Sequence, residues 1–202
     1  MDSIFTSQKQ IYTIGYSAFE IEAFISTLKQ YHITAVSDVR SSPYSKFKPD
    51  YNRELLSRTL KEFGIQYVFL GDYLGARFED KSVYVNRTVD FNTAKNLACF
   101  KHGVNRLIEG SKKYTIALLC AEKDPIECHR SILIAKNISK IFNVFHILAD
   151  SSIESHKQLE QRLEKRFGLD QAVLFGDTLK MAYDKQASKI AYAEVHDDAI
   201  ED

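Results

Sequence analysis

The residues with the clearest chemical potential lie between Cys120 and Arg130, where an apolar run gives way to a charged loop. Cys128, His129 and Arg130 stand at the predicted start of a helix, and a thiol beside cationic side chains has a lowered pKa that favours the thiolate. Cys128 is therefore a candidate nucleophile, His129 and Glu122 are candidate acid–base groups, and Arg130 is a candidate anion ligand. The alternative is that Cys128 is a small buried residue, since free cysteines often belong to the core.

The spacing in this segment excludes several known kinds of site. A cysteine phosphatase carries C-x5-R, but counting from Cys120 the arginine position holds Ile126. The sequence contains neither a Walker loop nor G-x-G-x-x-G. A structural zinc site needs four ligands, and only Cys120, Cys128 and His129 are at hand, so a fourth would have to come from elsewhere. We therefore expect no metal and no cofactor.

Asp38 and Arg40 follow a second apolar run. The guanidinium of Arg40 has the fork geometry that suits phosphate or carboxylate, while Asp38 would orient a partner or take a proton. The alternative is a salt bridge at the end of a loop. Because Arg40 and Arg130 stand at loop or helix-start positions, we expect neither arginine to stabilise the core.

Basic and aromatic side chains alternate in the next segment, between Tyr44 and Arg53. Such a pattern can hold a phosphate backbone while the rings stack on bases, which would suit a nucleic-acid-binding module. The alternative is that the rings cover the edge of a sheet. The basic members are Lys46, Lys48 and Arg53, and the aromatic members are Tyr44, Phe47 and Tyr51.

The elements that position these residues alternate along the chain. Apolar runs predict strands at 11–14, 35–39, 67–70, 115–119 and 144–148. Helical spacing predicts helices at 18–30, 53–63, 90–108, 130–142, 155–167 and 177–192. This alternation predicts an α/β fold, namely a three-layer Rossmann-like domain of about five mainly parallel strands with helices on both faces. The order we expect is 3-2-1-4-5 in sequence numbering of the strands.

Ligands of such sheets bind outside the carboxyl ends of the strands, so the residues that follow each strand are the candidate site. The candidate catalytic residues are Asp38, Glu122, Cys128 and His129. The candidate ligand-binding residues are Gly15, Tyr16, Ser17, Arg40, Gly71, Gly75, Arg77 and Arg130. The other histidines have no partner at a useful spacing, and we interpret His146, in a predicted strand, as a packing residue.

Composition limits the class of protein. The 202 residues carry 27 Lys and Arg and 27 Asp and Glu, a balance that excludes a globally basic nucleic-acid binder. No apolar run approaches the roughly 20 residues of a membrane helix, and we expect no membrane partner. The start of the chain has no signal-peptide core, and three cysteines indicate a reduced, cytoplasmic setting. We expect one domain over 1–192, with about 168–192 as a helical extension packed on it, and a disordered acidic tail over 193–202.

Several motifs together resemble the domain-of-unknown-function family 488. They are T-I-G-Y-S at 13–17, D-V-R-S-S-P at 38–43, L-G-x-x-L-G at 70–75 and L-L-C-A-E-K-D-P-x-x-C-H-R at 118–130. Near the end, R-F-G-L-D, L-F and K-x-x-Y-x-x-Q-x-x-K-I-A-Y at 180–192 also look like that family, so the resemblance covers about 11–192. Tyr16 stands where many relatives carry histidine, so no proton transfer is implied there. The resemblance implies a cytoplasmic single-domain α/β protein and no particular reaction.

These observations leave three hypotheses. The first is an enzyme that acts on a phosphate-bearing ligand, a nucleotide or a nucleic-acid base, with arginines neutralising the phosphate. The second is a nucleic-acid-binding module without chemistry of its own, whose binding would depend on salt. The third is a thiol redox or metal-binding protein that uses Cys120 and Cys128, against which the absence of C-x-x-C counts. The oligomeric state is left open.

Overall fold

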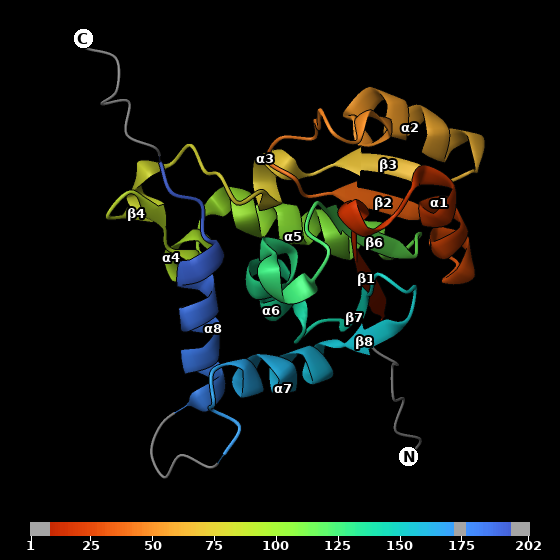
Figure 1. Ribbon diagram of the computed structural model, residues 1–202. Helices are drawn as coiled ribbons and strands as arrows, with labels where there is room; N and C mark the ends of the chain where they lie inside the picture. The colour runs from red at the N-terminus through yellow and green to blue at the C-terminus, as the bar shows by residue number, and fades with distance from the viewer. Residues whose placement is uncertain (1–8, 172–176, 195–202) are drawn as a thin grey trace, which may run out of the picture.

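The computed structural model describes residues 9–171 and 177–194, and a six-stranded sheet lies at its centre (Figure 1). The strand order is β3-β2-β6-β1-β7-β8, in which only the edge strand β8 runs antiparallel to its neighbour. The strands are β1 (Gln10–Gly15), β2 (Ala35–Asp38), β3 (Gln66–Phe69), β6 (Ile116–Cys120), β7 (Asn143–Ile147) and β8 (Ile153–Ser155). The expected α/β fold with a mainly parallel sheet is confirmed.

The predicted strand order is wrong at one point, because β6 lies between β1 and β2 instead of outside β1. All five residues of β6 are buried, and a strand that is apolar throughout is covered on both faces. β2 is equally buried and β1 is buried after its first residue, so burial places all three strands inside the sheet without ordering them, whereas β3 is only partly buried and lies at an edge.

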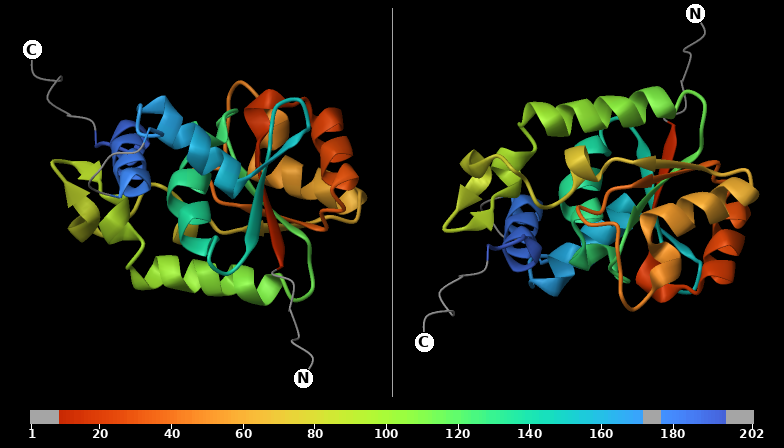
Figure 2. Two further views of the ribbon diagram at one scale, coloured as in Figure 1. Left: turned by 90° about the horizontal axis from the view of Figure 1, so that it is seen from below. Right: turned by 90° about the horizontal axis from the view of Figure 1, so that it is seen from above.

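Helices cover both faces of the sheet (Figures 1 and 2). One face packs against α1 (Ile21–Gln30) and α2 (Arg53–Glu62) through an apolar cluster that includes Ile14, Phe24 and Leu56. The opposite face packs against α5, η5 and α7, with Leu118 and Leu107 among the buried residues, and α8 packs on α7 and η5. These elements are α5 (Ala98–Gly110), the π-helical segment η5 (Arg130–Ala135), α6 (Lys136–Ile138), α7 (His156–Arg166) and α8 (Thr178–Ile190).

Two predicted helices differ from the structure. The helix expected over 90–108 is divided into α4 (Phe91–Ala94) and α5, because Leu97 has an extended backbone with ψ 144°. Asp90 caps α4 by accepting from the backbone N–H groups of Asn92 and Thr93. The helix expected over 130–142 is the π-helical η5 followed by one turn of α6. A π-helical turn is rare and occurs often at functional sites.

A small ribbon and the last helix meet beside the sheet. The remaining short elements are η1 (Tyr16–Ala18), η2 (Pro49–Tyr51), α3 (Gly71–Leu74), η3 (Lys81–Val83), β4 (Tyr84–Val85), β5 (Thr88–Val89) and η4 (Pro125–Glu127). The antiparallel ribbon β4–β5 was not predicted, and Val89 donates to the carbonyl of Tyr192, just after α8. α8 contacts η4, where Gln186 donates to the carbonyl of Ile126 at 3.0 Å.

Some expectations lie outside the described residues. These are the L-F motif at 174–175 and most of the acidic tail, residues 195–202. Among the described residues, the helices are too short or too polar for any of them to cross a membrane.

Candidate active site

The loops after β1 and β6 meet at the carboxyl end of the sheet, where these strands lie side by side. The chain leaves β1 for α1 on one face and β6 for η5 on the other, which makes this the switch point at which open α/β sheets bind ligands. Gly15 pairs with Cys120 across the two strand ends. A Cβ atom on Gly15 would lie 1.8 Å from the carbonyl oxygen of Glu122, so only glycine allows the two loops to approach this closely.

Asp38 and Arg40 form a buried ion pair at the end of β2. Arg40 donates from Nε to Asp38 Oδ1 at 2.9 Å and from Nη2 to Oδ2 at 2.6 Å. Tyr67 donates to the same Oδ2 at 2.7 Å, and Arg40 Nη2 also donates to the carbonyl of Tyr51 at 2.8 Å. These contacts hold the guanidinium in one orientation. The alternative role of Asp38 in proton transfer stays a prediction.

The burial of Arg40 and Arg130 corrects the expectation that neither arginine stabilises the core. Arg40 is 4% exposed and Arg130 is fully buried, and Arg130 Nη1 donates to the carbonyl of Glu122 at 2.7 Å. Removing one partner of a buried ion pair costs about 3–5 kcal/mol, so Arg40 also contributes to folding. Among the described residues, Arg40 Nη1 and Arg130 Nε and Nη2 are buried and have no hydrogen-bond partner. Buried nitrogens without a partner require an explanation, and one explanation is a ligand or ion that binds them.

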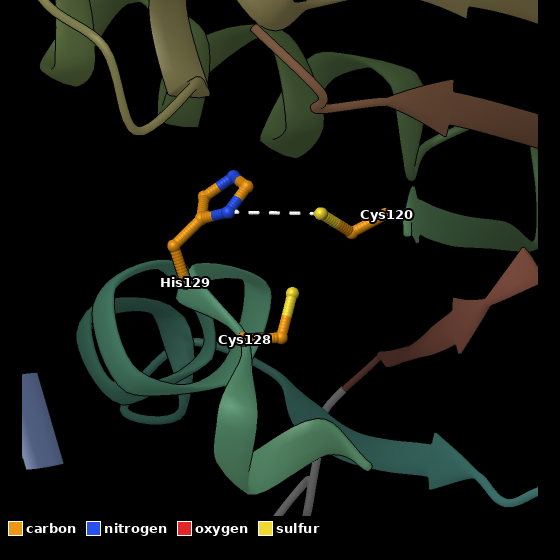
Figure 3. Close-up of side chains that lie close together, drawn as sticks. All are labelled: Cys120, Cys128 and His129. Atoms are coloured by element: carbon orange, nitrogen blue, oxygen red, sulfur yellow. Dashed lines mark hydrogen bonds between the residues drawn. The ribbon is translucent and has the colours of Figure 1, made fainter. Parts of the chain in front are cut away.

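Two thiols, an imidazole and a carboxylate form a compact cluster beside Arg130. Cys120 Sγ lies 3.6 Å from His129 Nδ1 (Figure 3). The carboxylate of Glu122 accepts from Cys128 at 2.8 Å and from Cys120 at 3.2 Å. The Sγ atoms of the two cysteines and a ring nitrogen of His129 all lie within 4.8 Å of one another. The structure thus brings together Glu122, Cys128 and His129, three of the four candidate catalytic residues, and adds Cys120.

The tautomer of His129 follows from its second contact. Its Nε2 lies 3.0 Å from the backbone carbonyl oxygen of Val39, which can only accept, so Nε2 carries the proton. In the neutral ring Nδ1 then has a free electron pair, and Nδ1 faces Cys120. Val39 lies between Asp38 and Arg40, so this contact ties the cluster to the loop after β2.

The surroundings shift the pKa values of the cluster in opposite directions. Burial alone would raise the pKa of the Cys128 thiol, but its hydrogen bond with Cys120 and the charges of Arg130 and His129 place the pKa well below its usual value. Burial and the neighbouring Cys128 raise the pKa of Cys120. The same causes raise the pKa of Glu122. The lowered pKa of Cys128 agrees with the prediction from the sequence. The side chain is 1% exposed, and its reactivity stays a prediction.

A cavity of about 450 Å³ opens beside this cluster. Its lining includes Cys120, Glu122 and His129 as well as Arg40 and Arg77. The volume falls within the roughly 300–1,000 Å³ of small-molecule sites. Cys128 and Arg130 are buried behind the residues that face this space.

Aromatic rings also line the cavity. Tyr16 stacks on Tyr51 with ring centres 4.6 Å apart, and the guanidinium of Arg77 lies 4.7 Å from the centre of the Tyr192 ring. Tyr192 was not among the predicted site residues, because α8 is distant in sequence and carries no motif that follows a strand. Tyr16 and Arg77 therefore lie where the sequence analysis placed a ligand.

Five of the eight predicted ligand-binding residues do not line the cavity, namely Gly15, Ser17, Gly71, Gly75 and Arg130. Ser17 is exposed beyond the end of β1, and its N–H donates to the carbonyl of Ala121. Gly71 and Gly75 are buried in the turn after β3, where a Cβ on Gly71 would lie 2.1 Å from the carbonyl oxygen of Arg40. These two glycines allow α3 to pack against the loop that carries Arg40.

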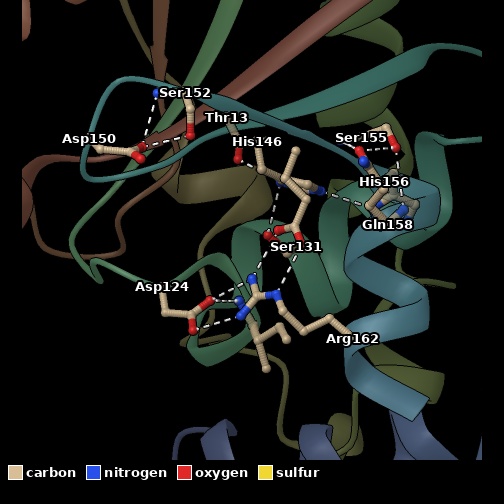
Figure 4. A network of polar contacts seen from close by, with 12 residues as sticks. Thr13, Asp124, Ser131, His146, Asp150, Ser152, Ser155, His156, Gln158 and Arg162 are labelled. Carbon is tan, nitrogen blue, oxygen red and sulfur yellow. Dashed lines mark hydrogen bonds and ion pairs between the residues drawn. The ribbon is translucent and has the colours of Figure 1, made fainter. Parts of the chain in front are cut away.

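A chain of hydrogen bonds behind the cluster was missed by the sequence analysis. His146, interpreted as a packing residue, lies 2.8 Å from Thr13 Oγ1 and 3.0 Å from His156, as part of the network in Figure 4. His156 Nε2 lies 3.0 Å from the Tyr183 hydroxyl, which donates to Glu160 at 3.0 Å. No spacing along the chain indicates this contact, because the residues come from β1, β7, α7 and α8.

Comparisons with known proteins identify one family. The family described as "Domain of unknown function DUF488" matches residues 20–136, which is more than half of the chain. The matched region contains D-V-R-S-S-P and the C-H-R segment, and it includes neither T-I-G-Y-S nor the motifs near the end of the chain. No curated protein and no solved structure matches.

Proposed function

The chain belongs to the DUF488 family, and we propose that it is an enzyme that binds a phosphate-bearing small molecule, a nucleotide or a nucleic-acid base, in the cavity at the carboxyl end of its sheet. The observation that carries this proposal is Arg40, which lines the cavity with its buried Nη1 lacking a partner among the described residues. Asp38 and the Tyr51 carbonyl already fix the other nitrogens of the fork. An anion could accept from Nη1 while the rest of the fork stays in place, once the atoms that cover this nitrogen move aside.

Other residues around the cavity support the same ligand class. Arg77 lies exposed at the rim and would add a second positive charge, since arginine suits phosphate recognition. Tyr16, Tyr44 and Tyr192 also line the cavity, and an aromatic ring can stack on a base. This combination favours a nucleotide over a simple inorganic anion.

The proposed chemistry belongs to the side chains that face this space. Glu122 and His129 line the cavity and can exchange protons with a bound molecule, the commonest contribution of such side chains to catalysis. Cys128 is buried behind them and contacts Glu122 at 2.8 Å, so it would position that carboxylate. Arg40 would hold the phosphate while the reacting group faces Glu122 and His129.

The binding half of the proposal is tested by titrating the protein with a panel of nucleoside monophosphates and inorganic phosphate. Arg77→Gln is expected to weaken binding by about ten- to a hundredfold, the cost of a lost charge-assisted contact, with unchanged stability. Arg58→Gln is the matched control, because Arg58 is exposed on α2 and does not line the cavity. Equal affinity of Arg77→Gln and wild type, or no binding of any member of the panel, would refute the anion site.

The enzymatic half needs a second measurement. Any ligand that binds is incubated with the protein, and its conversion is followed by mass spectrometry. Glu122→Gln is expected to retain the affinity of wild type within a few-fold and to lose turnover, because Arg40 and Arg77, not Glu122, would hold the phosphate. Binding without conversion by the wild-type protein would leave a binding module and contradict the enzyme.

A specific observation keeps the nucleic-acid-binding module as a second candidate. Phe47 is 96% exposed and Tyr44 is 54% exposed on the loop next to the cavity, where bases could stack on them. Lys48 and Arg53 are engaged within the protein, since Lys48 pairs with Glu20 and Arg53 lies over the ring of Phe69. Salt-dependent binding of a single-stranded oligonucleotide that is lost in Phe47→Ser would favour this candidate over the enzyme.

A further inference from the structure

We propose that Cys120, Cys128 and His129 bind a zinc ion, with the carboxylate of Glu122 completing its coordination. This site rests on the geometry of the buried cluster and goes beyond the proposed anion-binding enzyme, because it does not depend on Arg40 or Arg77. The three residues are the group of possible metal ligands in the described part of the chain whose donor atoms lie within 4.8 Å of one another.

The distance between the donor atoms of Cys120 and His129 fits a tetrahedral zinc ion. With Zn–S near 2.3 Å and Zn–N near 2.0–2.1 Å, a sulfur and a nitrogen ligand lie about 3.5 Å apart. Cys120 Sγ and His129 Nδ1 are 3.6 Å apart. Zinc can therefore enter between them with little movement of either side chain.

The orientation of His129 is the one that metal-binding histidines have. Such a histidine donates its other ring N–H to a carbonyl or carboxylate, which fixes the ring and its tautomer. The Nε2 of His129 makes that contact with the carbonyl oxygen of Val39 at 3.0 Å. The electron pair on Nδ1 consequently faces the sulfur of Cys120.

Glu122 supplies the fourth ligand that the sequence analysis lacked. Its Oε2 lies 2.8 Å from Cys128 Sγ and 3.2 Å from Cys120 Sγ, where it accepts from both thiols. Zinc would take the place of the thiol protons, which binding would release, and the carboxylate would move so that its oxygen lies about 3.5 Å from each sulfur. Because Glu122 also lines the cavity, the ion would lie at the cavity wall.

The charge of the cluster also fits a divalent cation. Two thiolates and a carboxylate carry three negative charges, one more than Zn²⁺ neutralises. The fully buried guanidinium of Arg130 next to them supplies one further positive charge. The loaded site is therefore neutral as a whole. Thiolate and imidazole ligands favour zinc over magnesium or calcium, which prefer oxygen.

The test uses the full chain, purified with a reductant, and Co²⁺ as a spectroscopic substitute for zinc. We expect one metal ion per chain, d–d absorption typical of tetrahedral Co²⁺, and a thiolate-to-cobalt band with the intensity of two thiolates. Cys120→Ser should bind Co²⁺ at least about a hundredfold more weakly, since loss of an outer partner alone costs about 10–100-fold. Cys99→Ser, which replaces the third cysteine in α5, should leave the spectrum unchanged.

Each outcome decides the proposal. A folded, reduced wild-type protein that binds no Co²⁺, or whose band corresponds to fewer than two thiolates, would overturn it. If Cys120→Ser does not fold, the wild-type spectrum still decides, because its intensity counts the thiolate ligands directly. The nucleotide titration is a separate readout, so anion binding without metal binding would remove the zinc site alone, and the reverse result would remove the anion site alone.

Discussion

Lowering the pH from 7 to 5 should destabilise the folded protein, because His146 and His156 are buried as neutral rings. Burial lowers the pKa of His156 to about 4. Burial, together with the nearby His156 and Arg130, lowers the pKa of His146 well below its usual value. In the unfolded chain both rings titrate near 6.5, so the unfolded state binds more protons below that pH. Stability is therefore unaffected above pH 6.5 and falls as the pH falls toward 4.

The expected loss can be worked out for His156. With a folded pKa of about 4 and an unfolded pKa of about 6.5, the free energy of unfolding decreases by about 2 kcal/mol between pH 7 and pH 5. His146 acts in the same direction. Glu160 has the opposite effect on stability; its Oε1 lies 3.6 Å from His156 Nε2. Burial raises the pKa of Glu160, so its carboxylate takes up a proton more readily in the folded state than in the unfolded state.

Urea unfolding at pH 7, 6 and 5 measures this effect. Between pH 7 and pH 5 the free energy of unfolding of His156→Gln should decrease by about 2 kcal/mol less than that of wild type, since glutamine does not titrate. The control is His102→Gln, because His102 is exposed on α5 and its variant should retain the wild-type dependence. A His156→Gln variant with the full wild-type slope would refute the reasoning.

Three substitutions probe the packing around the site by urea unfolding. Gly15→Ala should lose about 1–3 kcal/mol or more, because its Cβ would lie 1.8 Å from a backbone oxygen. Gly110→Ala should lose less, because its Cβ would meet only the end of the flexible Ile116 side chain, at 3.2 Å; equal effects would contradict the close approach. Tyr67→Phe should lose about 1–3 kcal/mol by removing a donor to buried Asp38, and an unchanged midpoint would argue against that hydrogen bond. Ser155→Ala should lose about 1 kcal/mol by uncapping α7, which wild-type stability would exclude.

The sequence by itself determined the elements and the family. Apolar runs placed five strands within about two residues of their observed ends, because a buried parallel strand needs continuous apolar side chains. The motifs that follow these strands also identified the family, which the match over residues 20–136 confirms. The antiparallel β8 and the ribbon β4–β5 escaped prediction, since strands of two or three residues are too short to show a pattern.

The sequence also located the cavity wall in part. Arg40, Glu122 and His129 were selected because residues at the carboxyl ends of parallel strands meet at one edge, and all three line the cavity. The order of the strands was not determined in this way. The pattern of apolar residues within each strand indicates how deeply that strand is buried. Neither β1 nor β2 carries a local signal that identifies β6 as its neighbour.

Only the tertiary structure decided which groups touch. Cys120 and Cys128 are separated by a loop whose path cannot be read from residue spacing, yet the carboxylate of Glu122 contacts both sulfurs. The contact between His146 and His156 likewise depends on how α7 packs against β7. Periodicity and turn residues are short-range signals along the chain, whereas a site of this kind depends on distances between elements, and those are set by the packing of the whole core.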